Sequence, residues 1–426
     1  MQDSTGMAGR LLLAGAAIVG AGAAAPPAVR QVVTGPVAVY WMSAQTQTGM
    51  GMGMGMGGMG GGRPSMGAML GMGRGGSDVS RSLILQLGSS QRPTGEAAAQ
   101  HLPPQGLGAG PSLPLLTPRR ESPVREEPGL PPSYEKPRGR MLIFWGCGEA
   151  ARPGQPLVID FARVAAGQMP PAFTQAMTSL NISAMQPPSP ARNATYGEWP
   201  NERTRTQVPG DGSLAGAHVI KGNYSPQIDF SITPQQDFLP PVRMTANDQL
   251  PSGAFQLGWR RVDGATGYVA SAMGGDGDTV VMWSSSEVQS LLFALPDYLK
   301  PADVTRLVAS KALMAPTQTA CAVPREVARA APQAMYQFVA YGDEANFSYP
   351  PRPADPKQAW NIAWTVKVRY RSATGGLLGM EMPGAYGDGD DSAAPGRTGQ
   401  PPAKPRPKSR GGDILRGLGV PLPGGR

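Results

Sequence analysis

A tract of methionine and glycine between Thr48 and Arg74 constrains the fold of this chain more than any other segment. It reads GMGMGMGMGGMG and then MGAMLGMG. Glycine at this density disfavours both helix and strand, because a glycine backbone loses so much conformational freedom on ordering. The tract must therefore lie outside the regular elements of the fold. Its thioether side chains are soft and polarizable, and they suit either irregular apolar gaps or soft metals such as Cu(I).

Strand-like runs flank this tract on both sides. Residues 37–42 combine β-branched and aromatic side chains, and residues 82–87 place leucines at alternate positions. If these two strands pair, the tract becomes a long loop, 46–77, within a hairpin. The entropy of closing a loop grows only slowly with its length, so such an insertion is tolerable.

Glycine and proline limit how much of the chain can fold. The 58 Gly and 46 Pro form about a quarter of the 426 residues, a share typical of low-complexity tracts. We therefore expect two folded domains among longer unstructured segments. The first is a β-rich domain over 34–233 that contains loop 46–77 and Pro-rich excursions at 89–139 and 169–208. The second spans 250–374.

Alternating hydrophobicity predicts a mostly β fold. The clearest strand is 362–370, where one set of side chains is apolar and the other set includes Lys367 and Arg369. Apolar residues at helical spacing predict helices over 286–295 and 302–313. The expected architecture is two β-sandwich-like domains, the second with one or two inserted helices, together with long disordered Gly/Met- and Pro-rich segments.

The stretch WRRVDGATGY, from Trp259 to Tyr268, joins an alternating strand to a turn and a second strand. It resembles the region between the B and C strands of fibronectin type III and immunoglobulin-like β-sandwiches, where a core Trp precedes a short loop and a core Tyr. The resemblance implies such a sandwich over residues 252–374. It implies no activity, because a fold of this kind does not determine function. The predicted helices after residue 285 depart from the family pattern.

The N-terminus has the features of an export signal. Arg10 precedes the apolar run 11–20, and Ala21-Gly22-Ala23 forms an A-x-A cleavage motif. Cleavage there would remove residues 1–23, while an uncleaved anchor or an alanine-rich disordered start are the alternatives. We expect an exported protein in the periplasm, on the outer cell surface or secreted, with no transmembrane span after cleavage. The composition is similar to that of exported proteins from high-GC bacteria.

Positive charge gathers at the C-terminus. Most of the formal net charge of +8 lies from Arg397 to Arg426, where seven Lys and Arg face only Asp413. Residues 375–426 are expected to form a disordered, basic, Pro-rich tail. Such a tail suits an anionic envelope polymer or a protein partner. The rest of the chain is close to neutral and gives no support for specific nucleic-acid binding.

Few residues suited to catalysis are present. Cys147 and Cys321 are the only cysteines, and His101 and His218 are the only histidines. In an oxidising compartment the cysteines can pair, and two separately buried free thiols are the alternative. His218 lies in a strand-like run and is expected to be a surface or hydrogen-bonded core residue. We predict no catalytic residues.

The methionines of the tract form the candidate metal site. Their Met-x-Met and Met-x-x-Met spacings can place three sulfurs around one Cu(I) or Ag(I) ion. The spacings resemble the methionine motifs of exported bacterial copper-handling proteins. A low-complexity loop without function and an apolar contact surface are the alternatives, since no His, Cys or Asp accompanies the sulfurs. The candidate ligands are Met50, Met52, Met54, Met56, Met59, Met66, Met69 and Met72.

These features favour an exported, non-enzymatic envelope or cell-surface structural or interaction protein. One alternative is a soft-metal binding protein that uses the Met/Gly loop, with Cu(I) as the only cofactor considered. Another is a carbohydrate-binding or carbohydrate-active protein. In that case Trp145 with Glu149, or Tyr341 with Asp343 and Glu344, would line a cleft.

Overall fold

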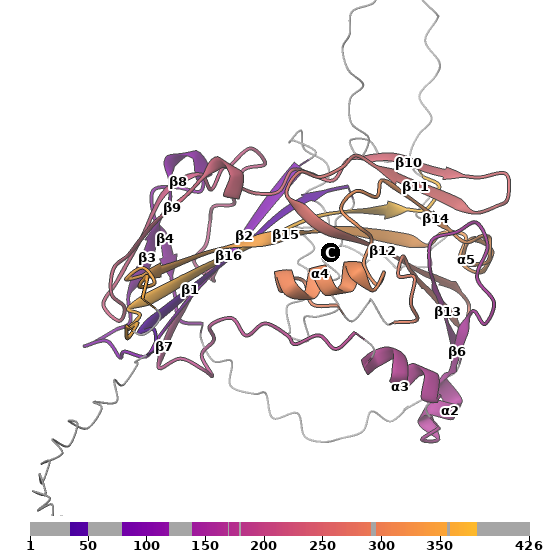
Figure 1. Ribbon diagram of the computed structural model, residues 1–426, viewed down its shortest axis with the longest axis horizontal. Coiled ribbons are helices and arrows are strands. Elements are labelled where there is room, and N and C mark those ends of the chain that lie inside the picture. Colours follow the sequence, from indigo (N-terminus) through magenta and orange to yellow (C-terminus); the bar gives the residue numbers. More distant parts are fainter. Residues whose placement is uncertain are drawn as a thin grey trace, which may run out of the picture. The chain divides into compact units, whose positions relative to one another are not determined.

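The computed structural model describes residues 35–49, 79–118, 139–168, 170–178, 180–290, 295–355 and 358–380. All of them belong to one compact unit, Met1–Gly387, and the second unit, Asp388–Arg426, lies outside the described residues. The prediction of a mostly β protein with more than one sheet is confirmed (Figure 1). No described helix has both the length and the apolar character needed to cross a membrane.

A nine-stranded sheet forms the centre of the fold. Its strands, in spatial order, are β6 (Leu157–Asp160), β5 (Arg140–Trp145), β13 (Thr279–Ser284), β12 (Ala265–Asp276), β15 (Met335–Tyr349), β16 (Trp364–Leu377), β1 (Ala38–Thr48), β2 (Val79–Ser89) and β7 (Thr195–Trp199). The pairs β1–β16 and β5–β13 are parallel and the other neighbours are antiparallel. The sheet therefore joins segments from both predicted domains.

The first two strands pair along their full length. Their register runs from Ala38 opposite Ser89 to Thr48 opposite Val79, so the Met/Gly tract connects two adjacent strand ends. The predicted loop start at residue 46 is wrong, because β1 continues to Thr48. The Thr46 and Thr48 hydroxyls donate to the carbonyls of Leu239 and Val242, which favours strand there over loop.

Two smaller sheets cover the inner face of the large one. The four-stranded sheet has the order β4 (Leu113–Leu115), β3 (Ala99–Leu102), β8 (Gly216–Gly222) and β9 (Ile228–Ile232). The three-stranded sheet has the order β10 (Met244–Gln249), β11 (Phe255–Trp259) and β14 (Ala320–Val323). The fold thus has two sandwich-like halves that share one sheet.

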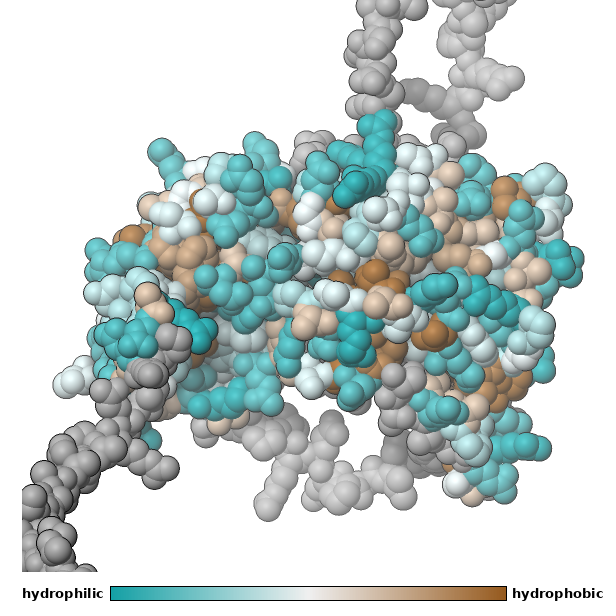
Figure 2. Space-filling view, viewed as in Figure 1, coloured by the Kyte–Doolittle hydropathy of each residue, from teal (hydrophilic) through white to brown (hydrophobic). Residues whose placement is uncertain are grey.

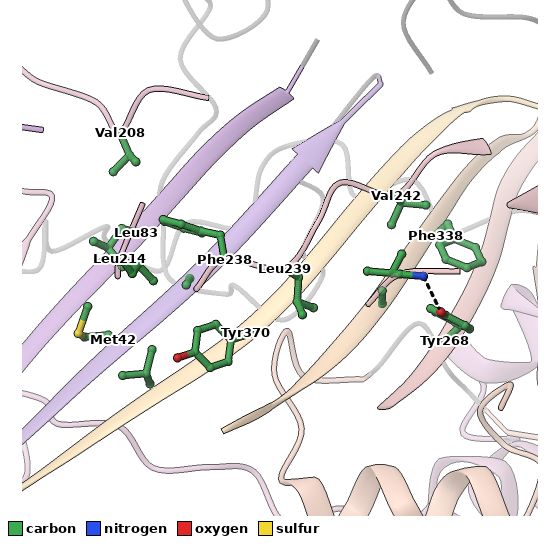
Figure 3. Close-up of a cluster of buried hydrophobic side chains, with 14 of the residues drawn as sticks. Met42, Leu83, Val208, Leu214, Phe238, Leu239, Val242, Tyr268, Phe338 and Tyr370 are labelled. Carbon is green, nitrogen blue, oxygen red and sulfur yellow. Dashed lines mark hydrogen bonds between the residues drawn. The ribbon is translucent and has the colours of Figure 1, made fainter. Parts of the chain in front are cut away.

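Aromatic contacts show how the layers pack. The Phe230 ring of β9 lies 5.0 Å from that of Phe347 in β15, and the Trp259 ring of β11 lies 4.6 Å from that of Phe338. Both contacts belong to one continuous apolar core, and Figure 3 shows part of it, with Met42 and Phe338 drawn among the strands. Burial of this apolar surface is the main force that holds the layers together.

Short helices and turns complete the fold. They are α2 (Phe161–Ala165), α3 (Pro171–Thr178), α4 (Pro301–Ala309) and α5 (Arg325–Ala330), with 3-10 turns η2 (Gln105–Leu107) and η3 (Pro234–Gln236). Helix α4 covers the outer face of the large sheet, where its Val304 and Leu307 share a second apolar cluster with Val339 and Tyr341 of β15. The outer face beyond α4 carries the site described below.

Several predicted boundaries differ from the structure. The division into 34–233 and 250–374 does not separate two sheets, because in the nine-stranded sheet the four strands of the second range lie between two groups of strands from the first. The Pro-rich excursion 89–139 contains β3 and β4, and 169–208 contains α3 and β7. Proline fits in β4 because this strand lies at a sheet edge, where a missing amide donor costs little. Strand β16 also continues past residue 375, the expected start of the tail.

The helix predicted over 286–295 is absent from its described part, 286–290. Serine side chains take the place of backbone partners there. The Ser286 hydroxyl accepts from the amide of Val288, and the Ser290 hydroxyl donates to Ser286 Oγ. Such local bonds compete with the helical hydrogen-bond pattern. The second predicted helix, 302–313, corresponds to α4.

Candidate functional site

Three cations project from the outer face of β16. Strands β16 and β1 are parallel, and their register sets Lys367 beside Trp41, Arg369 beside Ser43 and Arg371 beside Gln45. Successive strand residues point to opposite faces, and the alternate residues Tyr40, Met42 and Ala44 of β1 are buried in the core. Lys367, Arg369, Arg371, Trp41 and the nearby Tyr298 are called here the cation–aromatic strip.

Two of the three cations have acidic partners. Lys367 Nζ forms an ion pair with Glu344, whose side chain is 7% exposed, and it lies 5.6 Å from the centre of the Trp41 ring. Arg371 forms an ion pair with Asp297, and its Nε donates to Gln45 Oε1 at 2.9 Å. These pairs fix the two ends of the strip.

Arg369 occupies the middle of the strip without an ion pair among the described residues. Its guanidinium carbon lies 4.4 Å from the centre of the Tyr298 ring and 5.1 Å from that of Trp41. Its Nε donates to Ser43 Oγ at 2.7 Å. Burial lowers the pKa of the Arg369 guanidinium, while nearby Tyr298 and Glu344 act in the opposite direction. The arrangement is a half-buried positive charge held between two rings.

The sequence showed only part of this strip. Lys367, Arg369 and Arg371 are the solvated positions of the predicted strand, so their shared face was expected from the alternation. The approach of the Trp41 and Tyr298 rings to these cations was not expected, because it depends on the pairing of β16 with β1 and on the loop before α4. On the molecular face in Figure 2, hydrophobic side chains are interspersed with hydrophilic ones.

A second polar group lies inside the core. The two histidines of the chain, both fully buried, are in contact, with His101 Nε2 2.8 Å from His218 Nδ1. His101 Nδ1 lies 2.7 Å from the Tyr40 hydroxyl, and His218 Nε2 lies 2.7 Å from the Leu214 carbonyl oxygen. The group joins β3 and β8 of the four-stranded sheet to β1 of the large sheet. The Phe230 ring stacks on His218 with centres 5.0 Å apart.

The hydrogen-bond directions in this group follow from its last acceptor. A carbonyl oxygen can only accept, so His218 Nε2 carries a proton and, in the neutral ring, Nδ1 accepts from His101 Nε2. His101 Nδ1 then accepts from the Tyr40 hydroxyl. Every ring nitrogen has one partner when both histidines are neutral. An added proton on His218 would move the proton of His101 to Nδ1 and turn the Tyr40 hydroxyl from donor to acceptor, and it would place a positive charge in the core.

Burial opposes any charge in this group. It lowers the pKa of His101 well below its ordinary value, and a charge on His218 would lower it further. Burial also lowers the pKa of His218, against smaller opposing effects of the Leu214 carbonyl and Asp237. Burial raises the pKa of Tyr40, and Tyr224 adds to this effect. His218 is thus a hydrogen-bonded core residue, and His101 is part of the same core.

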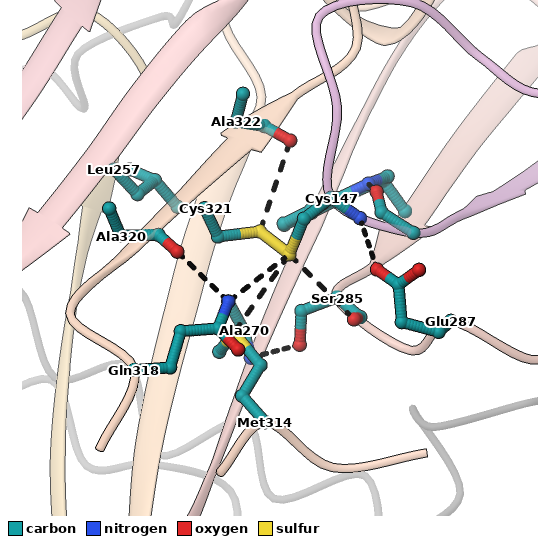
Figure 4. Close-up of a disulfide and its surroundings, with 12 residues drawn as sticks. Cys147, Leu257, Ala270, Ser285, Glu287, Met314, Gln318, Ala320, Cys321 and Ala322 are labelled. Atoms are coloured by element: carbon teal, nitrogen blue, oxygen red, sulfur yellow. Dashed lines mark hydrogen bonds between the residues drawn. A yellow bond between two sulfur atoms is a disulfide. The ribbon is translucent and has the colours of Figure 1, made fainter. Parts of the chain in front are cut away.

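A disulfide joins Cys147 to Cys321, with Cα atoms 5.1 Å apart (Figure 4). Cys147 lies after β5, and Cys321 lies on β14 and is 3% exposed. The bond therefore links the large sheet to the three-stranded one, across 174 residues of sequence. The Cys147 amide also donates to Glu287 Oε1 at 3.1 Å.

The other candidate residues either lie outside the described part of the chain or are buried. The eight methionines of the predicted metal site lie outside the described residues, as do the signal segment 1–23 and residues 381–426 of the tail. Tyr341 is 4% exposed beneath α4, and Glu344 pairs with Lys367, so neither lines an open cleft. Within the described ranges, no three His, Cys, Asp or Glu side chains gather as a metal site would require.

The fibronectin type III resemblance stays a prediction. Trp259 and Tyr268 lie on strands of different sheets, and their rings meet edge to face with centres 5.9 Å apart. The Tyr268 hydroxyl also accepts from the Val262 amide. No protein-family model, curated protein or solved structure matches the chain.

Proposed function

We propose that this chain is an exported, non-enzymatic envelope or cell-surface interaction protein. The observation that carries the proposal is the disulfide between Cys147 and Cys321, because such bonds persist in oxidising compartments and are rare in the cytosol. The cation–aromatic strip supports the interaction role, since Arg, Trp and Tyr are the residue types that carry most of the energy of binding interfaces. The predicted export signal and the basic tail from Arg397 to Arg426 fit the same role.

Cell fractionation tests this proposal. We expect the chain in the envelope fraction, beginning at Ala24, with both cysteines resistant to a thiol reagent until a reductant is added. Truncation after Gly396 should release the chain from the envelope, because it removes the positive charges that hold it on an anionic surface. A chain found in the cytosol with free thiols would contradict the proposal.

A soft-metal role has a structural argument of its own. The β1–β2 ladder brings Thr48 and Val79 opposite each other, so the tract between them is closed at its base. Closure raises the effective concentration of its sulfurs around one ion. We therefore keep Cu(I) or Ag(I) binding by Met50–Met72 as the second candidate function.

Titration with Cu(I) against a competing chelator tests this second function. Removal of residues 50–72 should abolish binding, since it takes away all eight candidate thioether ligands. The matched control replaces the eight methionines with leucine, which keeps the loop length and removes every thioether. Equal Cu(I) affinity in the intact and the leucine-substituted chains would exclude metal binding by the tract.

A further inference from the structure

We infer that Arg369 is the centre of a binding site for an oxyanion, a carboxylate or a phosphate group. The site lies on the outer face of the nine-stranded sheet, between the rings of Tyr298 and Trp41. The inference names the chemistry of a ligand for the proposed interaction protein. It rests on the proposed function only for where that ligand comes from, not for the existence of the site.

Charge is the first argument. The strip holds three cations, and two of them are matched by Glu344 and Asp297. Glu344 stands opposite Arg369 in the β15–β16 register, but the acid forms its ion pair with Lys367. One positive charge is therefore left without an acidic partner among the described residues. A half-buried charge without a partner has lost hydration and gains from an incoming anion.

Hydrogen-bond geometry is the second argument. Ser43 Oγ accepts from Nε of Arg369 and holds the guanidinium from the side of the sheet. No described residue accepts a hydrogen bond from either terminal nitrogen of Arg369. Neither nitrogen is among the fully buried atoms that lack a partner, so both are open to solvent. A guanidinium fork of this kind fits the two oxygens of a carboxylate or phosphate.

Rigidity is the third argument. The residue Tyr298 is 8% exposed, and its ring packs over both Arg369 and Arg371, while Trp41 is fixed on the β1 strand. The two rings limit the rotamers of Arg369 before any ligand arrives. A preorganised donor loses less conformational entropy on binding than a free arginine does.

The test is a titration of purified protein with inorganic phosphate and, separately, with glucuronate, at constant ionic strength set with chloride. The signal is the indole N–H resonance of Trp41, assigned with the variant Trp41→Phe. We expect a saturable shift with at least one of the two anions. A response to phosphate alone identifies a phosphate source, and a response to glucuronate alone identifies a carboxylate source.

Variants separate this site from general ion effects. Arg369→Gln should weaken binding about tenfold to hundredfold, as expected for loss of charge-assisted hydrogen bonds. Arg369→Lys should give an intermediate loss, because it keeps the charge and removes the fork. The matched control is Arg152→Gln. It removes an arginine that follows β5, lies outside the strip and already forms an ion pair with Glu287. This control should leave the affinity unchanged.

Two results would overturn the inference. One is a Trp41 resonance of the wild-type protein that responds to neither anion more than to chloride, a result that does not depend on the folding of any Arg369 variant. The other is an Arg369→Gln protein that keeps the wild-type affinity. The titration uses purified protein, so its failure leaves the fractionation result intact, and a cytosolic chain could still bind the anion.

Discussion

Acidification from about pH 7.5 to about pH 5.5 is expected to reduce the free energy of unfolding steeply, because both histidines are buried in their neutral form. Their folded-state pKa values lie below the ordinary value of 6.5. Below that pH the unfolded chain binds protons that the folded chain excludes. The contribution of the two neutral histidines to the free energy of unfolding is therefore fully present above pH 6.5 and is lost as the pH falls below it. The limiting slope is about 1.4 kcal/mol per pH unit for each histidine, or about 2.7 for both.

Urea denaturation at a series of pH values measures this slope. Carboxylates contribute little above about pH 5.5, since their ordinary pKa values are near 4. With only two histidines in the chain, proton NMR also reports on them directly. Both His101 and His218 should titrate below the ordinary pKa of 6.5 in the folded protein, His101 well below it. A ring that titrates near pH 6.5 would contradict the buried pair.

Two variants separate charge from packing in this pair. His218→Gln should reduce the slope to about 1.4 kcal/mol per pH unit, because one titrating group remains. Tyr40→Phe should keep the slope of the wild type, since both histidines remain. It should also lower stability by about 1–3 kcal/mol at every pH, because His101 Nδ1 loses its donor in the core. A slope that is unchanged in His218→Gln would show that other groups control the acid response.

Strands with a long alternating pattern could be predicted from the sequence. In β9 (Ile228–Ile232) and β16, the period of two places every second side chain in the core, and the pattern is visible without any partner. The short strands β3 and β4 could not be found this way. Three or four residues show no clear period, and Pro114 at an exposed position of β4 indicates a loop when its neighbours are unknown.

Pairing between distant segments explains what the sequence missed at the site. The parallel pairing of β1 with β16 sets Ser43 beside Arg369, 326 residues away, and a local pattern carries no information about that register. His101 and His218 meet for the same reason, since β3 and β8 are neighbours only in the folded sheet. The chemistry of each residue was visible in the sequence, but its partners were not.

Loss of the disulfide is expected to destabilise the protein by about 5 kcal/mol, near the upper end for a single crosslink. The reason is the length of the closed loop, since Cys147 and Cys321 are 174 residues apart. In the chain-entropy model, a longer loop restricts the unfolded chain more and raises its free energy. Alanine at both positions removes the bond without placing a polar group at the buried Cys321. Urea unfolding of the double variant and of the wild type gives the difference.

The effect of the lost crosslink on stability can be distinguished from the effect of changed packing at the two alanines. Reduction of the wild type should lower its urea midpoint to nearly that of the double variant, and reductant should leave the double variant unchanged. The dependence of the free energy on urea should also rise without the crosslink, because the freer unfolded chain exposes more surface. The single variant Cys147→Ala retains a thiol at Cys321 and should match the double variant. A wild type that unfolds at the same urea concentration with and without reductant would show that the crosslink does not constrain the unfolded chain.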